Sequence, residues 1–365
     1  MKLPKSFFFF LFVTQAIITL GHALLSSALT YFFPFFAVHE DSLLTTLILL
    51  SVSFLVLSLL EFNVESPILR YSYILSAIWI PTWFYLLLAS FLSLIGSFIF
   101  PKSSVGLAAT IYSCALALSL YGVINARVIR VTNLPIKLPN LPELWKGKTA
   151  VMVSDLHLGH VLRYGFAGRV IAKINHLRPD IVFIPGDFFD GVKTNFVDLA
   201  NLFRAVKVPK GIYYVSGNHE QIAGYKVCEE AIAGAGIHIL ENAKVEVDGL
   251  QIVGTAYQHE TVESLAELFA AMGIDRERPS IYLKHVPNHF EAAEQAGISL
   301  QLSGHSHRGQ LWPGNWITRA IWKGYDYGLK KFGPAMQVFT SSGVGTWGPP
   351  LRVGSRSEVV RITFL

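Results

Sequence analysis

Charge is distributed very unevenly along this chain. Residues 1–125 carry few charged side chains, and nearly all Lys, Arg, Asp and Glu lie beyond them. Over the full 365 residues, 52% are hydrophobic and 15% are charged, so these averages conceal a boundary. About 20 consecutive apolar residues cross the hydrocarbon core of a bilayer as a helix. The chain is therefore predicted to begin with a helical membrane region and to continue as a soluble domain.

Four stretches in the uncharged part are long and apolar enough to span a bilayer: 7–30, 43–60, 73–95 and 105–124. The first could instead be a cleaved signal peptide. Its apolar core exceeds the roughly 7–15 residues that signal peptides use, and no small-residue cleavage site follows it directly. We therefore expect four retained transmembrane helices within residues 1–126, acting as an anchor. The lone His22 is expected to be packed rather than functional.

Basic residues near the span ends predict the orientation. With four spans, one side receives Lys2, Lys5, Arg70, Arg127, Arg130 and Lys137. The opposite side receives only Lys102. Lys and Arg are enriched on the cytoplasmic side, which predicts an integral protein of a plasma or bacterial inner membrane with a cytoplasmic soluble domain. Three or five spans would reverse this orientation.

Residues 127–148 contain Pro135, Pro139 and Pro142, and we interpret them as a short stiff linker. The basic residues there either meet anionic lipid headgroups or only set topology. Membrane lipids are therefore expected partners. The chain shows no basic helix or aromatic platform of the kind that binds nucleic acid, so a nucleic acid polymer is not an expected partner.

Residues 149–365 alternate short apolar runs with helix-like segments. Apolar runs of this kind suit strands buried on both faces, and their alternation with helices predicts an α/β domain. Late strands at about 337–340 and 358–364 favour two sheets with helices outside. Cys114 and Cys228 provide no disulfide framework and are expected to be unpaired core thiols.

Five polar motifs each follow a predicted strand. They are Asp155-Leu156-His157, Gly186-Asp187, Gly217-Asn218-His219-Glu220, Lys284-His285 and Gly304-His305-Ser306-His307. Carboxylate, amide oxygen and imidazole are ligands of hard or borderline divalent cations. Asp187 can share its two oxygens between two cations. Two cations about 3.5–4 Å apart activate water and stabilise phosphoryl transfer, and His219 is placed to protonate a leaving oxygen.

In this order, the motifs resemble the calcineurin-like metallophosphoesterase superfamily. The resemblance covers 149–365 and implies a four-layer β-sandwich flanked by helices, and a hydrolase with two divalent metal ions. Manganese is the first candidate, with iron and zinc as alternatives. The family pattern implies that one ion is bound by Asp155, His157, Asp187 and His307. It implies that the second is bound by Asp187, Asn218, His285 and His305, and that His219 acts as acid or charge stabiliser.

The stretch Gly304–Gln310 and the tail Ser341-Ser342-Gly343-Val344-Gly345 with Pro349-Pro350-Leu351-Arg352 are similar to membrane-linked members, including the UDP-2,3-diacylglucosamine hydrolase-like branch. Arg308 departs from that pattern, and either contacts a phosphate or sits at the rim. His160 and Arg163 are further substrate-binding candidates, and Asp190 is a candidate for orienting a ligand His. The aromatic and basic stretch 308–335 forms an interfacial lid or a packed loop.

The leading hypothesis is a membrane-anchored two-metal phosphoesterase that cleaves a phosphodiester or pyrophosphate of a lipid-linked substrate resembling UDP-diacylglucosamine. A phosphodiesterase acting on a soluble nucleotide or a general phosphoester is the alternative, and comparing micellar with soluble substrates separates the two. A membrane scaffold with an inactive site would be expected to have lost at least one of the eight site residues. A transporter would be expected to carry charges within its spans.

Overall fold

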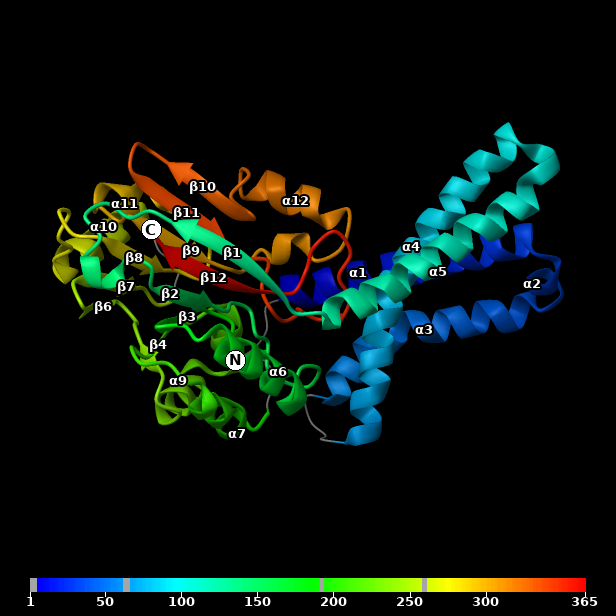
Figure 1. Cartoon of the computed structure of the whole chain (residues 1–365). Helices are drawn as coiled ribbons and strands as arrows, with labels where there is room; N and C mark the ends of the chain where they lie inside the picture. Colours follow the sequence, from blue (N-terminus) through cyan, green and yellow to red (C-terminus); the bar gives the residue numbers. More distant parts are fainter. Residues whose placement is uncertain (1–4, 62–65, 191–193, 258–260) are drawn as a thin grey trace. The chain divides into compact units, whose positions relative to one another are not determined.

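The computed structural model describes residues 5–61, 66–190, 194–257 and 261–365 (Figure 1). The chain divides into two compact units. The first unit is Met1–Ile124 with Gly348–Leu351, and the second is Asn125–Trp347 with Arg352–Leu365. Lys2, which the orientation argument uses, lies outside the described residues.

The first unit contains the predicted apolar helices. They are α1 (Lys5–Phe32), α3 (Glu40–Glu61), α4 (Pro67–Ile99) and α5 (Ser104–Arg127), with the short α2 (Pro34–Val38) between the first two. The last three residues of α5 belong to the second unit. Within the described residues, four helices are long and apolar enough to cross a membrane, judged by length and composition. The prediction of four apolar helices is confirmed. Pro67 occupies the first turn of α4, where its missing N–H costs nothing.

The contact between α1 and α4 is built around His22. The ring of His22 stacks on Trp83 with centroids 4.7 Å apart, and Trp79 Nε1 donates to His22 Nε2 at 2.9 Å. Gly21 is required beside it, because a Cβ there would collide with the Trp83 ring. His22 is thus a packed side chain, as expected.

The second unit contains two six-stranded sheets. The first has the order β1 (Arg130–Ile136), β12 (Glu358–Phe364), β2 (Thr149–Met152), β3 (Ile181–Pro185), β4 (Ile212–Val215) and β5 (His238–Ile239). The second has the order β10 (Gly328–Phe332), β11 (Met336–Thr340), β9 (Leu300–Ser303), β8 (Ser280–Leu283), β7 (Leu250–Gly254) and β6 (Ala243–Val247). Within each sheet the central strands β2–β4 and β7–β9 are parallel.

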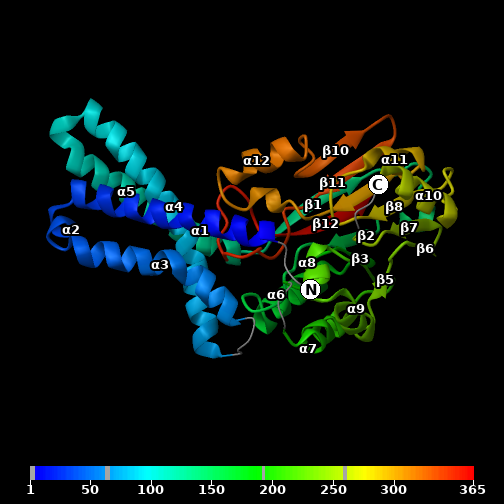
Figure 2. The same ribbon diagram turned by 180° about the vertical axis from the view of Figure 1, so that it is seen from behind.

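The sheets pack face to face and are covered by helices on both outer faces (Figures 1 and 2). One apolar core joins the facing sides of the two sheets, for example Phe183 of β3 and Leu302 of β9. A second core lies under α6 (Tyr164–Leu177), α7 (Phe196–Asn201) and α9 (Tyr225–Gly234), and a third under α10 (Val262–Met272) and α11 (Phe290–Gln295). The expected four-layer α/β sandwich is confirmed.

The predicted linker over 127–148 needs a correction, because it contains strand β1. β1 pairs in parallel with β12 along its whole length, and the two run side by side in Figures 1 and 2. Leu134 and Ile136 alternate inward and are buried in the core between the sheets. Pro135 is tolerated because β1 is an edge strand, where a missing N–H breaks no ladder.

The two cysteines are unpaired, but only Cys228 is a core thiol. Cys114 is exposed on α5, so the expectation of two core thiols is wrong there; α5 is an apolar candidate span whose outward face has no protein cover. Burial, with the nearby Glu220 charge, raises the pKa of the Cys228 thiol to about 12.

We expect Cys228 to resist iodoacetamide at pH 8 in a Cys114→Ser protein and to react only on unfolding, because the thiolate is the reactive form. Mass spectrometry of the alkylated protein measures this, and rapid labelling of the folded protein would contradict it.

Candidate metal centre

Parallel strands from both sheets bring the five motifs to one edge of the sandwich. β2, β3 and β4 are parallel neighbours, and the motifs containing Asp155, Asp187 and Asn218 follow them. In the other sheet, β8 precedes His285 and β9 precedes His305. Because parallel strands end at the same sheet edge, side chains far apart in sequence meet there.

The backbone at these motifs is strained. Asp155, His157, Asp187, His305 and His307 all have positive φ, between 47° and 69°. Such conformations are uncommon for residues other than glycine and cluster at functional sites. Two motif glycines permit close approach of neighbouring loops. A Cβ at Gly217 would collide with the Asp187 carboxylate, and one at Gly304 would collide with Ser154 Oγ.

One group of side chains consists of Asp155, His157 and His307, all buried. Nε2 of His157 lies 3.0 Å from Nε2 of His307. The same His307 nitrogen lies 3.4 Å from Asp155 Oδ1. Asp187 also lies beside this group, with its Oδ2 3.7 Å from His157 Nε2. Ser154 Oγ donates to Asp155 Oδ2 at 2.5 Å and fixes that carboxylate.

The second group contains Asp187, Asn218, His285 and His305. His285 Nε2 lies 3.2 Å from Asp187 Oδ2 and 3.1 Å from Asn218 Oδ1. His305 Nδ1 lies 3.0 Å from the same amide oxygen and 3.1 Å from His285 Nε2. The other nitrogen of His285, Nδ1, is 3.0 Å from the carbonyl of Pro185, which orients the ring.

These donors fit two divalent cations that share Asp187. In each group two imidazole nitrogens face one another at about 3 Å. A neutral His285 with its proton on Nδ1, toward the Pro185 carbonyl, presents the lone pair of Nε2 to the position where a cation would bind. Burial lowers the pKa of His305 to about 3 and that of His307 well below its usual value, which keeps both rings neutral. Burial acts to raise the pKa of Asp187, but His285 and His157 hold it below its usual range.

Asp190 and His219 lie beside the first group. Asp190 Oδ1 is 3.3 Å from His157 Nδ1 and 3.8 Å from His219 Nδ1. The His219 ring packs edge-on against His157 with centroids 4.5 Å apart, and its amide donates to Asp187 Oδ1 at 3.0 Å. Burial lowers the pKa of His219. Asp190 is therefore placed to orient the His157 ring, and its carboxylate lies within ion-pair distance of His219.

For the three candidate substrate-binding residues, the contacts described below are with residues other than the predicted metal ligands. Arg308 directs its guanidinium over the ring of Tyr327, 4.3 Å from the centroid. Arg163 precedes α6 and lies over Tyr164 at 5.8 Å, and His160 occupies the turn between Leu158 and Leu162. Their roles in substrate binding stay predictions.

Glu220 is a residue of the centre to which sequence reasoning assigned no role. It is fully buried; its Oε1 accepts from the Phe189 amide at 2.9 Å and its Oε2 from the Gly217 amide at 2.8 Å. It therefore ties together the loops that carry Asp187 and Asn218. Burial and the charge of Asp187 raise the pKa of Glu220 to about 7. Its position directly after Gly-Asn-His was the available signal.

Arg352 is the second such residue, and it is completely buried. One guanidinium nitrogen donates to the carbonyls of Ser342 at 2.8 Å and Gly345 at 2.5 Å, and lies 3.2 Å from His307 Nδ1. Burial lowers the pKa of Arg352 to about 10, so the group stays charged at neutral pH. Arg352 thus holds both the loop after β11 and the His307 ring. Its only sequence signal was the Pro-Pro-Leu-Arg tail.

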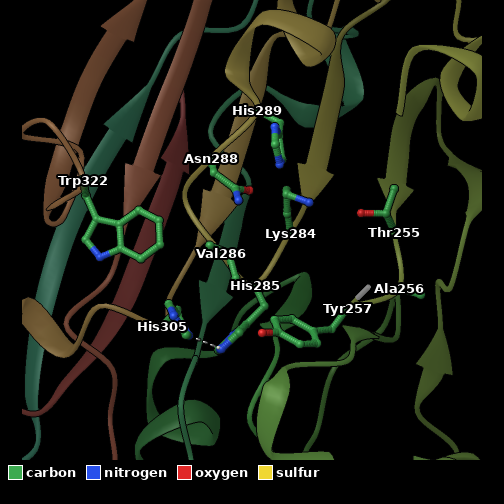
Figure 3. Close-up of a pocket in the computed structure, with 10 residues that line it drawn as sticks. All are labelled: Thr255, Ala256, Tyr257, Lys284, His285, Val286, Asn288, His289, His305 and Trp322. Carbon is green, nitrogen blue, oxygen red and sulfur yellow. Dashed lines mark hydrogen bonds between the residues drawn. The ribbon is translucent and has the colours of Figure 1, made fainter. Parts of the chain in front are cut away.

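A cavity of about 220 Å³ opens beside the second group (Figure 3). His285 and His305 contribute to its wall, with Tyr257 next to His285 and Trp322 next to His305. The ring centroids of Trp322 and His305 are 5.6 Å apart. The cavity therefore reaches this half of the centre beside two aromatic side chains.

Comparison with known proteins supports a phosphoesterase domain. The family model for "Calcineurin-like phosphoesterase" matches residues 149–309. A "Transmembrane protein with metallophosphoesterase domain" from Danio rerio is 30% identical over 68% of this chain and 60% of that protein. An "Uncharacterized metallophosphoesterase" from Helicobacter pylori is 30% identical over 62% of each. Another, from Aquifex aeolicus, is 31% identical over 68% of this chain and 97% of its own length. The matched part of this chain thus covers about three fifths of the length of the first two relatives.

Proposed function

Because this chain belongs to the calcineurin-like phosphoesterase family, we propose that it is a membrane-anchored hydrolase of a lipid-linked phosphodiester or pyrophosphate. It is a metal-dependent phosphoester hydrolase that uses two divalent metals. One observation supports the proposed substrate: the same chain contains both the converging Asp, Asn and His donors and four apolar helices. The proposed substrate is of the UDP-diacylglucosamine type.

The proposed mechanism assigns a task to each group of residues. Two cations, when bound, supply Lewis acidity toward water and toward the phosphate oxygens. Asp155, His157 and His307 would hold one, and Asn218, His285 and His305 the other, with Asp187 shared. His219 would donate a hydrogen bond to the leaving oxygen, and Asp190 would orient the ring of His157. Manganese is the proposed metal, with iron and zinc as alternatives.

Replacing His219 tests the acid role separately from metal binding. We expect His219→Gln to lower kcat on an aryl phosphodiester by about 10²–10⁴-fold, the usual contribution of general acid–base catalysis. The metal content should stay at the wild-type level, because His219 is not assigned as a ligand. His238→Gln, at an exposed position on β5, is the control. Loss of metal in the His219 variant would instead make His219 a ligand.

The proposal also places the catalytic domain on the cytoplasmic side. The support is the excess of basic residues on one side of the four candidate spans, including Arg70, Arg127 and Arg130. The enzyme domain follows the last candidate span directly in the sequence, since β1 begins three residues after α5 ends.

Two substrates with the same nucleotide pyrophosphate headgroup separate a lipid-linked from a soluble substrate. One carries long acyl chains in mixed micelles and the other carries none. For the purified full-length protein in detergent with manganese, we expect kcat/KM to be higher for the acylated substrate. Equal or higher kcat/KM for the acyl-free substrate would favour the soluble-nucleotide alternative and reduce the helices to an anchor.

A further inference from the structure

The helix α12 (Gly314–Ile321) exposes an apolar face next to the metal centre. Trp316, Ile317 and Ile321 are each exposed by more than 60%, and Trp312 just before the helix by 39%. At 100° per residue, the helix positions Trp316, Ile317, Ala320 and Ile321 form one continuous stripe. Large apolar side chains grouped on one exposed face mark an interaction surface rather than ordinary surface variation.

The start of α12 is fixed to the segment that carries His305 and His307. Gly309, with φ of 71°, lies against the backbone of Gly314 and Asn315, so closely that a Cβ at Gly309 would collide with it. The first turn of α12 is therefore packed on the chain that directly follows His307.

The end of α12 returns to the same segment. Trp322, which follows the helix directly, packs edge-on against His305 with ring centroids 5.6 Å apart. Ser306 Oγ donates to the carbonyl of Asp326 at 2.5 Å. The exposed stripe is consequently held at both ends by the motif that supplies two predicted ligands.

The chemistry of the stripe selects an occupant. Arg319 on the helix and Lys323 just after it are exposed, and Lys330 and Lys331 are exposed on β10. Helices with Trp and aliphatic residues on one face and basic residues beside it bind in the interface of bilayers with anionic lipids. Trp is also the residue enriched at the headgroup level. A bilayer is the surface that the four apolar helices of this chain would meet.

We infer that α12 inserts its apolar face into the headgroup region of an anionic bilayer and thereby holds the metal centre at the membrane surface. The inference rests on the proposed function and deepens it, because a centre held there takes a phosphate whose acyl chains remain in the membrane. α12 is then a positioning element for lipid substrates, and hydrolysis of a soluble phosphoester does not depend on it.

Kinetics with two substrates test this role. We expect the double variant Trp316→Ser/Ile317→Ser to raise KM at least about tenfold for a lipid-linked nucleotide pyrophosphate in nanodiscs containing phosphatidylglycerol, as loss of about 1.4 kcal/mol of binding would. Both kcat and KM for a soluble aryl phosphodiester should stay unchanged. The matched control is Leu144→Ser/Val197→Ser, which removes two other exposed apolar side chains of the same unit. An unchanged KM for the lipid substrate, or equal losses on both substrates, would overturn the inference.

A direct contact measurement keeps the test independent of activity on lipid substrates. Ile317→Cys in a Cys114→Ser protein is labelled with an environment-sensitive fluorophore and reconstituted in nanodiscs whose lipids carry brominated acyl chains. We expect bromine to quench the label, more strongly with phosphatidylglycerol than with phosphatidylcholine alone, and not to quench a label at Leu144→Cys. Absence of quenching would overturn membrane docking. A label fluorescence that changes with protein concentration instead of with the lipid would also overturn it, in favour of a protein partner or a second copy. If lipid substrates are not hydrolysed while the label is quenched, the proposed function fails and the docking surface stands.

Discussion

Replacing Asp187 by alanine should abolish phosphoester hydrolysis by the full-length protein. Asp187 lies near both groups of ligands, with Oδ2 3.2 Å from His285 Nε2 and 3.7 Å from His157 Nε2. Its other oxygen accepts from the His219 amide. Removing it withdraws an anion from both cation positions and frees the catalytic loop. We expect kcat on an aryl phosphodiester to fall by at least about 10³-fold, at the upper end of the loss seen when one stabilising group is removed from an active site.

Metal analysis of the same variant shows whether the loss has the expected cause. The wild-type protein should carry two divalent ions per chain and Asp187→Ala fewer than two. Asp248→Asn is the control, because Asp248 is a partly exposed carboxylate paired with Lys210 at the surface. A variant with two bound ions and wild-type turnover would remove Asp187 from the shared position.

Replacing Arg352 by methionine should cause the largest loss of stability. Its guanidinium is fully buried and donates to the carbonyls of Ser342 and Gly345. Those carbonyls would be left without their donor, and the negative field of Asp155 and Glu358, which favours the charged guanidinium, would lose its cation. Breaking a buried charged network by removing one partner costs about 3–5 kcal/mol. The unfolding temperature of the detergent-solubilised protein measures this loss.

The same substitution should also impair catalysis, because Arg352 lies 3.2 Å from His307 Nδ1 and holds that ring. Arg278→Met is the matched control: Arg278 forms a surface ion pair with Glu246, and exposed pairs contribute little. An Arg352→Met protein with unchanged unfolding temperature would show that the buried guanidinium is not structurally required.

Local patterns in the sequence were enough to predict the architecture. The apolar helices are visible because a bilayer demands long uncharged stretches. The strands that precede Asp155, Asp187 and Asn218 are visible because buried parallel strands are short and wholly apolar, and each ends in a polar motif. Since such ends share one sheet edge, the meeting of the five motifs could be expected before the structure was known.

Features that depend on distant pairing could not be predicted in the same way. The prolines around Pro135 indicated a linker, whereas β1 is completed by β12, which lies more than 200 residues further along the chain. Arg352 and Glu220 acquire their roles from backbone groups of other loops, and a charged residue in a sequence gives no sign of such burial. Arg308 likewise meets Tyr327 only through the return of the chain after α12.

The most direct test of the account is hydrolysis of a lipid-linked nucleotide pyrophosphate by the purified full-length protein in detergent. The protein is assayed with manganese, after removal of metal by a chelator, and after manganese is restored. The account predicts product in the first and third conditions, and none in the second or with Asp187→Ala. Failure to cleave this substrate or any aryl phosphomonoester or phosphodiester in the metal-loaded state would contradict it.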